Sequence, residues 1–210
     1  MTSGLFARTA DEVAAFLLAA TCAGCDRPGT LLCASCRDAL APRPVRRESP
    51  SGLPLVAALP FEGVPARVIR RLKEEGETSL ARPLGVALRS VLRDVGADAA
   101  LVPIPTSRAA FRRRGYRVPE LLLRRAGYRP RRLLLPARAA GDQRELGRVE
   151  RARNVRGSMR VAAATRPTRV VIVDDVTTSG ATFDEAARVL AASGIHVVAG
   201  VAAASTPMRS

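Results

Sequence analysis

The apolar residues of this chain alternate between short β-branched runs and longer stretches with helical spacing. Residues 170–173 read Val-Val-Ile-Val. This run is too short and too β-branched for a helix, so it predicts a parallel strand that is buried on both faces. Beyond Gly180, apolar residues recur at i, i+3, i+4 and i+7, which predicts a helix with one buried face. The residues of that face are Phe183, Ala186, Ala187 and Leu190.

The same patterns continue along the chain and predict a fold class. Further apolar runs predict strands at residues 55–59, 99–105, 131–135 and 195–203. Helical spacing predicts helices over about 64–76, with Gly76 as C-cap, and over about 79–95. Strands that alternate with helices indicate an α/β fold with a mostly parallel sheet flanked by helices.

The chain divides into three predicted parts. Residues 1–40 hold an N-terminal helix, over about 11–20, and a cysteine-rich knuckle. Residues 41–54 are rich in Pro and Arg and predict a linker. Residues 55–210 form the α/β domain. With 210 residues and 47% hydrophobic content, the chain is long and apolar enough to bury one full core.

Two acids and a hydroxyl-rich turn follow the strand at residues 170–173. Asp174 and Asp175 are expected at its carboxyl end, where open α/β sheets bind ligands. The turn then opens a helix, whose unpaired N–H groups favour a phosphate, and Gly180 permits close approach. The carboxylates suit ribose hydroxyls or a Mg²⁺ ion carried by a polyphosphate. The pattern therefore predicts a sugar-phosphate site; a βα turn that merely caps its helix is the alternative. The predicted phosphate-binding residues are Thr177, Thr178, Ser179, Gly180, Ala181 and Thr182.

The four cysteines form one cluster in the sequence. Cys22, Cys25, Cys33 and Cys36 give two C-x₂-C pairs separated by seven residues. Four thiolates at this spacing predict one structural Zn²⁺ site, closed because every ligand comes from protein. Disulfides or redox-active thiols are the alternative. The sequence has no export signal and no apolar stretch of the roughly 20 residues that a membrane helix needs. We therefore expect a cytoplasmic protein without membrane insertion.

Residues 170–182 closely resemble the phosphoribosyl-pyrophosphate (PRPP) motif of type I phosphoribosyltransferases: four apolar residues, two acids and a Thr-Thr-Gly-like turn. Ser179 stands where the family usually has a second Thr, and it keeps the hydroxyl. The chain is most similar to the ComF branch, in which a cysteine knuckle precedes the transferase-like domain. The resemblance covers nearly the whole chain. It implies a phosphoribosyltransferase-like fold that binds PRPP with Mg²⁺, and an unknown nucleobase or amine as acceptor.

The resemblance also implies roles for individual residues. Asp174 and Asp175 would hold the ribose hydroxyls and stabilise positive charge in catalysis, and Arg151 would close from a lid within residues 136–157. A solvated basic connector is the alternative for that stretch. Lys73 is the only lysine among 34 basic residues and matches the family by position. The implied pyrophosphate-binding residues are Lys73, Pro105, Thr106, Ser107 and Arg108. Ser107 also fits a plain helix N-cap.

A net charge of +15 keeps a second class of function open. Relatives in the ComF family are linked to natural competence, so the resemblance also implies single-stranded DNA or DNA-uptake proteins as partners. Clusters of arginine suit nucleic acid, but 3% aromatic content offers little base stacking, and solvated basic faces are the alternative. His196 is the only histidine, and the sequence offers no Ser-His-Asp triad, no His-Glu-x-x-His zinc-protease motif and no P-loop for nucleotide hydrolysis.

Overall fold

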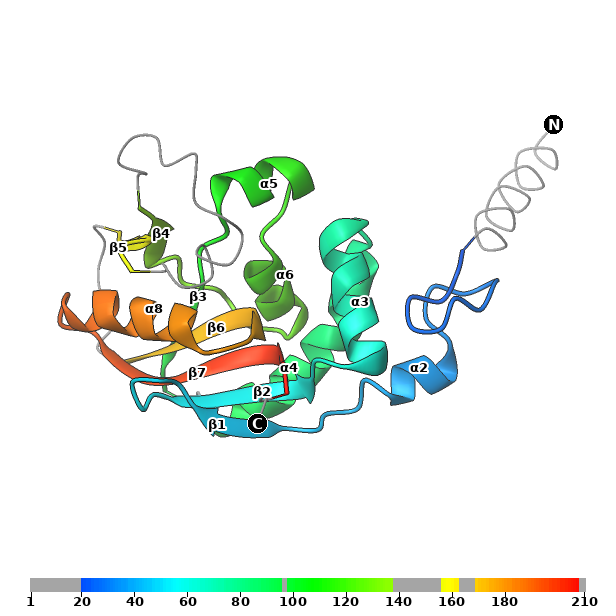
Figure 1. The fold of residues 1–210 in the computed structure, drawn as a ribbon, viewed down its shortest axis with the longest axis horizontal. Helices are drawn as coiled ribbons and strands as arrows, with labels where there is room; N and C mark the ends of the chain where they lie inside the picture. Colours follow the sequence, from blue (N-terminus) through cyan, green and yellow to red (C-terminus); the bar gives the residue numbers. More distant parts are fainter. Residues whose placement is uncertain (1–19, 96–97, 138–155, 163–168, 208–210) are drawn as a thin grey trace, which may run out of the picture.

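A computed structural model describes residues 20–95, 98–137, 156–162 and 169–207. The helix predicted over about 11–20 lies almost entirely outside the described residues. Among the residues described, none of the helices has the length and apolar character needed to cross a membrane. The chain forms a central sheet with helices on both faces, and the cysteine-bearing segment with helix α2 (Ala34–Asp38) lies at one side, next to α3 (Gly63–Glu74) (Figure 1).

Within the described residues, the main sheet has five strands in the order β1-β2-β7-β6-β3. All neighbouring pairs are parallel except β1 and β2, which form an antiparallel hairpin. This confirms the predicted α/β class with its mostly parallel sheet. The bounds of these strands are β1 Val45–Glu48, β2 Pro54–Pro60, β3 Ala100–Pro103, β6 Arg169–Thr177 and β7 His196–Ser205.

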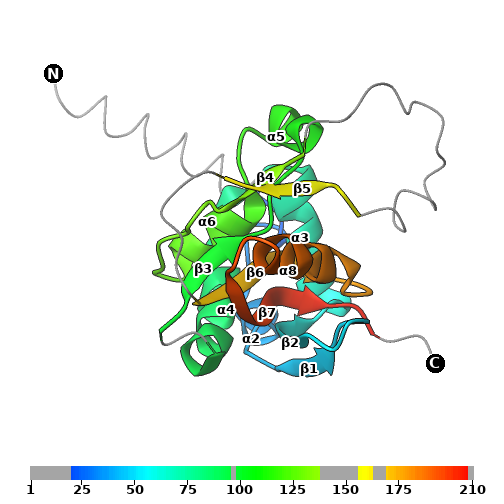
Figure 2. The same cartoon turned by 90° about the vertical axis from the view of Figure 1, so that its left-hand side faces the viewer.

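The two faces of the sheet are covered by different helices (Figure 2). One face packs against α3, α4 (Ala81–Val95) and α6 (Val118–Arg125), through core residues such as Leu72, Leu88 and Leu122. The other packs against α8 (Ala181–Ala191), whose Phe183 is 1% exposed. Because consecutive side chains of β6 alternate between the faces, Val171 and Val173 belong to the first core and Val170 and Ile172 to the second. The strand is buried on both sides, as its apolar run predicts.

Helix boundaries follow the local signals in the sequence. Helix α3 ends at Glu74, and Gly76 follows with a φ of +76°, a conformation that glycine adopts without strain. A short 3₁₀ turn (Thr78–Leu80) then leads into α4, so the helix predicted from residue 79 begins slightly later. Helix α8 starts directly after Gly180, which has a φ of +87°.

Three features differ from the sequence-based expectation. The stretch expected as a linker, residues 41–54, contains strand β1, which pairs with β2 as an edge of the sheet. The strand expected at 131–135 is the shorter β4 (Leu134–Pro136), which pairs with β5 (Met159–Val161) outside the main sheet. Helix α5 (Arg108–Arg114) had only the possible N-cap at Ser107 as a signal and α6 had none, because both helices are short.

Helices α4 and α6 pack closely at Gly85. A Cβ at this position would lie 2.8 Å from the backbone carbonyl carbon of Arg125 and 2.9 Å from the backbone nitrogen of Ala126. Backbone atoms cannot yield as a flexible side chain does, so we expect Gly85→Ala to destabilise the fold by about 1–3 kcal/mol, despite alanine's better helix propensity. Urea unfolding measures this. The control Val86→Ala, at an exposed site on α4, should change stability by less than about 0.5 kcal/mol.

Candidate functional site

Strand β6 carries both predicted acids close to its carboxyl end. The strand continues to Thr177, so Asp174 and Asp175 lie within the end of the strand rather than beyond it. Asp175 is 8% exposed and Asp174 is partly buried. The backbone N–H of Asp175 donates to Oδ1 of Asp174 over 2.8 Å, which fixes the orientation of that carboxylate. Two consecutive carboxylates therefore lie near the edge where a parallel sheet binds ligands, with side chains that alternate between the faces of the strand.

Lys73, far from the acid pair in the sequence, contacts one of its members. It lies in the last turn of α3, and its Nζ donates to Oδ1 of Asp175 over 3.1 Å. The two side chains are 27% and 12% exposed, so water screens the pair less than it would a surface ion pair. The structure thus brings together an acid and the single lysine, 102 residues apart in the chain.

The backbone around Lys73 is held by the segment that follows α5. Arg114 Nε donates to the carbonyl oxygen of Lys73 over 2.8 Å, and the Tyr116 hydroxyl donates to the carbonyl oxygen of Leu72. These carbonyls belong to the last turn of α3, which has no intrahelical donors for them. Arg114 and Tyr116 flank Gly115, the C-cap of α5, with a φ of +78°. Their contacts identify Arg114 and Tyr116 as supports for the end of α3 that carries Lys73.

The electrostatics of the acid pair are unusual. Burial, and then the nearby carboxylate of Asp175, raise the pKa of Asp174 well above its usual range. The hydrogen bond from the Asp175 backbone and the charge of Lys73 act in the opposite direction without offsetting this. Such a strongly perturbed carboxyl is typical of functional sites, because a stable fold gains nothing from it.

We expect Asp174→Asn to stabilise the free protein at neutral pH, by about 0.5–2 kcal/mol, because it removes a carboxyl group whose charged form is disfavoured by burial and by the nearby charge of Asp175. Since the folded pKa of Asp174 is raised, the folded protein binds more protons than the unfolded chain between the ordinary carboxyl range and that raised pKa. Wild-type stability therefore falls as pH rises through this window, and the stability of the variant should not show this fall. Thermal unfolding against pH measures it. The exposed Asp98→Asn is the control; equal curves for wild type and Asp174→Asn would contradict the expectation.

The turn after β6 packs closely against the β1–β2 hairpin at Gly180 and leaves two hydroxyl-bearing residues exposed. Thr178 and Ser179 are exposed, and Ser179 Oγ accepts from the Ala181 N–H over 3.3 Å. Gly180 is buried, and a Cβ there would lie 3.1 Å from Ser49 and from Leu55. Thr177 is 3% exposed, and its Oγ1 accepts a hydrogen bond from Arg47 of β1 over 2.6 Å. Ser179 thus binds one N–H of the first turn of α8, whose N-cap Gly180 has no side chain, and the exposed Thr178 lies beside it.

The predicted pyrophosphate loop leaves the sheet next to the acid pair. Pro103 of β3 pairs with Val173 of β6, and the Ile104 N–H donates to the Val173 carbonyl over 2.8 Å. Pro105 and Thr106 are partly buried, while Ser107 and Arg108 are exposed. Ser107 is the N-cap of α5, and its Oγ accepts from the Ala110 N–H over 3.2 Å. The N-cap interpretation of Ser107 thus holds, and the loop shares one edge of the sheet with the acids. Arg151 lies outside the described residues.

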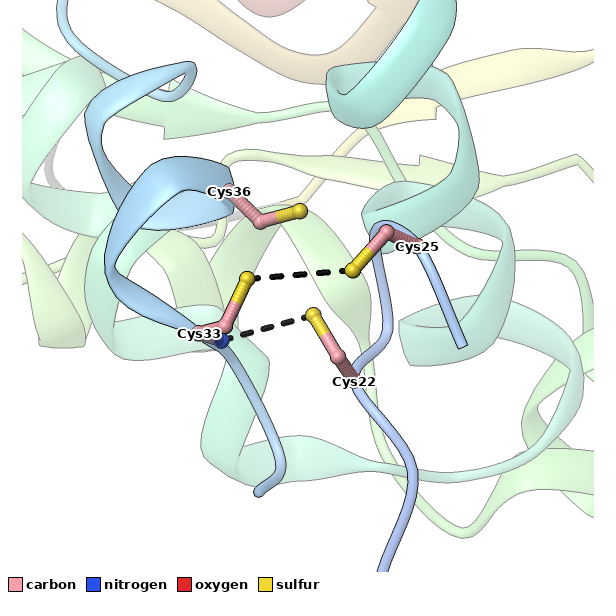
Figure 3. A group of neighbouring side chains, drawn as sticks. All are labelled: Cys22, Cys25, Cys33 and Cys36. Atoms are coloured by element: carbon pink, nitrogen blue, oxygen red, sulfur yellow. Dashed lines mark hydrogen bonds between the residues drawn. The ribbon is translucent and has the colours of Figure 1, made fainter. Parts of the chain in front are cut away.

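The four cysteines converge into a second candidate site, close to α3 (Figure 3). Their sulfur atoms all lie within 4.8 Å of one another, and all four are free thiols. Cys25 and Cys33 Sγ are 3.7 Å apart, and the Cys33 N–H donates to Cys22 Sγ over 3.3 Å. Hydrogen bonds from the Ser35 hydroxyl and the Cys36 backbone lower the pKa of Cys33 to about 6. The cluster can hold one metal ion.

The cysteine knuckle, residues 20–40, docks directly on α3. A Cβ on Gly24 would lie 2.6 Å from Cys36 Sγ and 2.9 Å from Val64 of α3, so the chain is in close contact there. Asp26 forms ion pairs with Arg67 and Arg71 of α3, and Arg71 also donates to the carbonyl and hydroxyl oxygens of Thr21. One helix therefore connects the cysteine cluster with Lys73.

Comparisons with known proteins find distant structural similarity only. No family model matches the chain, and no curated protein matches it. Among solved structures, adenine phosphoribosyltransferase from Rhodothermus marinus is 19% identical with a TM-score of 0.40, covering 81% of this chain and 86% of that one. Orotate phosphoribosyltransferase from Aeropyrum pernix is 19% identical, with a TM-score of 0.33, 80% of this chain and 77% of that one covered. Leishmania donovani UMP synthase is 18% identical, with a TM-score of 0.37; the match covers 80% of this chain but only 29% of the synthase. Similarity this distant says nothing about ligand or activity.

Proposed function

We propose that this protein binds PRPP together with Mg²⁺ and transfers or senses its phosphoribosyl group, as a protein similar to the ComF family. The observation that carries the proposal is the contact of Lys73 with Asp175, at the edge of the sheet where Asp174 and the hydroxylated turn also lie. Acids, a cation and phosphate-binding groups are the three components that a phosphorylated sugar diphosphate needs. The sequence resemblance of residues 170–182 supports the same ligand.

The chemistry assigns a task to each group. Asp174 and Asp175 would accept hydrogen bonds from the ribose hydroxyls, and their charge would stabilise the positive charge that develops at C1 as its bond to diphosphate breaks. The turn at residues 178–182 would hold the 5′-phosphate, so that the acceptor meets a sugar already in place. When bound, Mg²⁺ would neutralise charge on the diphosphate that leaves. The acceptor nucleophile then forms the new bond to C1.

Lys73 would act between the two halves of the ligand. In the free protein it pairs with Asp175. When the sugar hydroxyls occupy Asp175, the ammonium group would turn to the diphosphate beside the loop at residues 105–108. A compact point charge on a flexible stem suits such an exchange of partners better than the planar fork of arginine does. Such an exchange would account for lysine at this place in a chain that otherwise uses arginine, with chance survival of one lysine as the alternative.

For the cysteine cluster we propose a structural Zn²⁺ ion. Four thiolates around a tetrahedral zinc at Zn–S distances of about 2.3 Å lie about 3.8 Å apart. The Cys25–Cys33 separation of 3.7 Å and the grouping within 4.8 Å suit this geometry. Apart from the cysteines, the knuckle buries only Ala23, Leu32 and Leu40, so the ion would supply much of its stability. Measured zinc content of one equivalent per chain is the expected result.

Calorimetric titration with PRPP in the presence of Mg²⁺ tests the proposed function. We expect saturable binding by the wild type and none by the double variant Asp174→Ala with Asp175→Ala. Because that variant also alters burial, the exposed pair Asp94→Ala with Asp98→Ala serves as control and should bind like the wild type. Absence of binding by the folded wild type would contradict the proposal. Pyrophosphate release with a panel of nucleobases then distinguishes transfer from sensing.

Single-stranded DNA is the alternative ligand, and helix α5 is the observation that favours it. Arg108, Arg112 and Arg113 are exposed on this helix, and the guanidinium group of Arg117 lies 4.2 Å from the ring centre of the exposed Phe111. If this face binds DNA, affinity should fall steeply with salt and should not change in the Asp174→Ala, Asp175→Ala double variant. Fluorescence anisotropy with a labelled oligonucleotide measures both.

A further inference from the structure

Arg47 connects the edge of the sheet to the predicted phosphate-binding turn. It lies on β1, within the stretch that the sequence predicts as a linker, and its Nη2 donates to Thr177 Oγ1 over 2.6 Å. Thr177 is the last residue of β6 and the first of the turn. The two residues are 130 positions apart, so only the paired β1–β2 hairpin brings them together.

Among the described residues, no acid pairs with the charge of Arg47. Within the part of the chain that the structure describes, Arg47 forms no ion pair, and its Nε is buried without a hydrogen-bond partner. Burial lowers the pKa of its guanidinium group. By contrast, the partly buried Arg71 pairs with Asp26, Glu75 and Glu77. A partly desolvated cation without a counter-charge costs stability, and an anion bound nearby would offset that cost.

The same hairpin touches the turn and its helix at two further points. Ser49 lies so close to Gly180 that a Cβ there would come within 3.1 Å of it. Ser51 donates from its hydroxyl and its backbone N–H to the Asp184 carboxylate of α8, over 2.5 and 3.2 Å. The hairpin therefore contacts the segment from Thr177 to Asp184 at its start, middle and end.

We propose that Arg47 is a positioning residue for the phosphate-binding turn: it fixes Thr177 and supplies a permanent positive charge that favours a phosphate monoester dianion on the turn. The proposal rests on the proposed function and concerns the 5′-phosphate end of the ligand only. Since Arg47 contacts Thr177 and not the diphosphate loop, its effect belongs to ligands that carry a sugar phosphate.

Three ligands separate this role from a merely structural one. Calorimetry compares PRPP with Mg²⁺, ribose 5-phosphate, and Mg²⁺-pyrophosphate. We expect Arg47→Met to weaken binding of PRPP and ribose 5-phosphate by about tenfold each, and to leave Mg²⁺-pyrophosphate binding unchanged. Arg47→Lys keeps the charge and a donor, so its affinities for PRPP and ribose 5-phosphate should stay within about threefold of those of the wild type. The neighbouring Arg46→Met, at an exposed position of β1, is the matched control.

A double-mutant cycle with Thr177→Val tests the route through Thr177. Valine keeps the shape and removes the acceptor, so the losses in ribose 5-phosphate affinity from Arg47→Met and Thr177→Val should be clearly less than additive. Unchanged ribose 5-phosphate affinity in folded Arg47→Met overturns the inference, as does equal loss for pyrophosphate. If Arg47→Met does not fold, the Arg47→Lys variant decides: a loss of ribose 5-phosphate affinity as large as that of Thr177→Val overturns the inference. Failure of the wild type to bind any of the three ligands overturns the proposed function itself, and this inference with it.

Discussion

Removing the zinc proposed for the cysteine cluster is expected to unfold residues 20–40 while the α/β domain stays folded. In zinc-finger peptides, metal binding contributes on the order of 10 kcal/mol, which is folding free energy because the site does not exist without the ion. The knuckle should have a similar dependence, because its own four cysteines and a few backbone hydrogen bonds must be held together before it can keep its contacts with α3. Hydrogen exchange after chelation should show protection lost at Cys22, Ala23 and Cys33, and kept in β6 and β7.

The loss of hydrogen-exchange protection should extend into α3 but no further. Arg71 would lose Thr21 and Asp26 and keep Glu75 and Glu77, so exchange in the last turn of α3 should rise moderately. Asp26→Asn separates docking from metal binding: asparagine tolerates the φ of +61° at this position but cannot pair with Arg67 and Arg71. This variant should keep its zinc. Full protection of the knuckle after complete metal removal would contradict the prediction.

Replacing Lys73 by methionine is expected to weaken PRPP binding by about 10- to 100-fold, the range found for hydrogen bonds to charged groups. The change removes the cation that pairs with Asp175 and leaves two adjacent carboxylates without a positive neighbour from α3. Repulsion between these carboxylates and the ligand's phosphates then rises. Lys73→Arg keeps the charge with a different shape, and we expect intermediate affinity because a planar fork fits the 3.1 Å contact poorly.

The single lysine also allows a direct chemical readout. An acylating reagent can modify amines only at Lys73 and at the chain's N-terminus. Bound PRPP should slow acylation of Lys73, measured by peptide mass spectrometry, while the N-terminal amine reacts at an unchanged rate and serves as the internal control. Equal rates at Lys73 with and without saturating PRPP would show that the ammonium group does not meet the ligand.

Strand β6 and helix α8 show what local pattern could predict. Val170 and Ile172 alternate with Val171 and Val173 between two apolar cores, so the apolar run itself requires burial on both faces. The switch to a 3.6-residue period at Phe183 requires a helix on one face of the sheet. Asp174 and Asp175 follow by position alone, because they come directly after the run. The cysteine spacing likewise predicts a shared site without further information.

Strand β1 and Arg47 show what local pattern could not predict. Residues 45–48 read Val-Arg-Arg-Glu, in which only one residue is apolar, so the segment resembles a linker. It becomes a strand because β2 offers an unpaired edge. Once paired, Arg47 faces inward and reaches Thr177. The contacts of Tyr116 and Arg114 with the end of α3 are equally invisible in sequence, because they join segments more than 40 residues apart.

The sequence by itself determined the α/β class, the position of the acids and the hydroxylated turn after β6, and the cysteine grouping, because each depends on the spacing of neighbouring residues. Only the tertiary structure decided that Lys73 pairs with Asp175, that the knuckle docks on the helix carrying Lys73, and that an edge strand supports the turn. Those contacts join residues distant in sequence. Their formation depends on how whole elements pack, and no local periodicity records that packing.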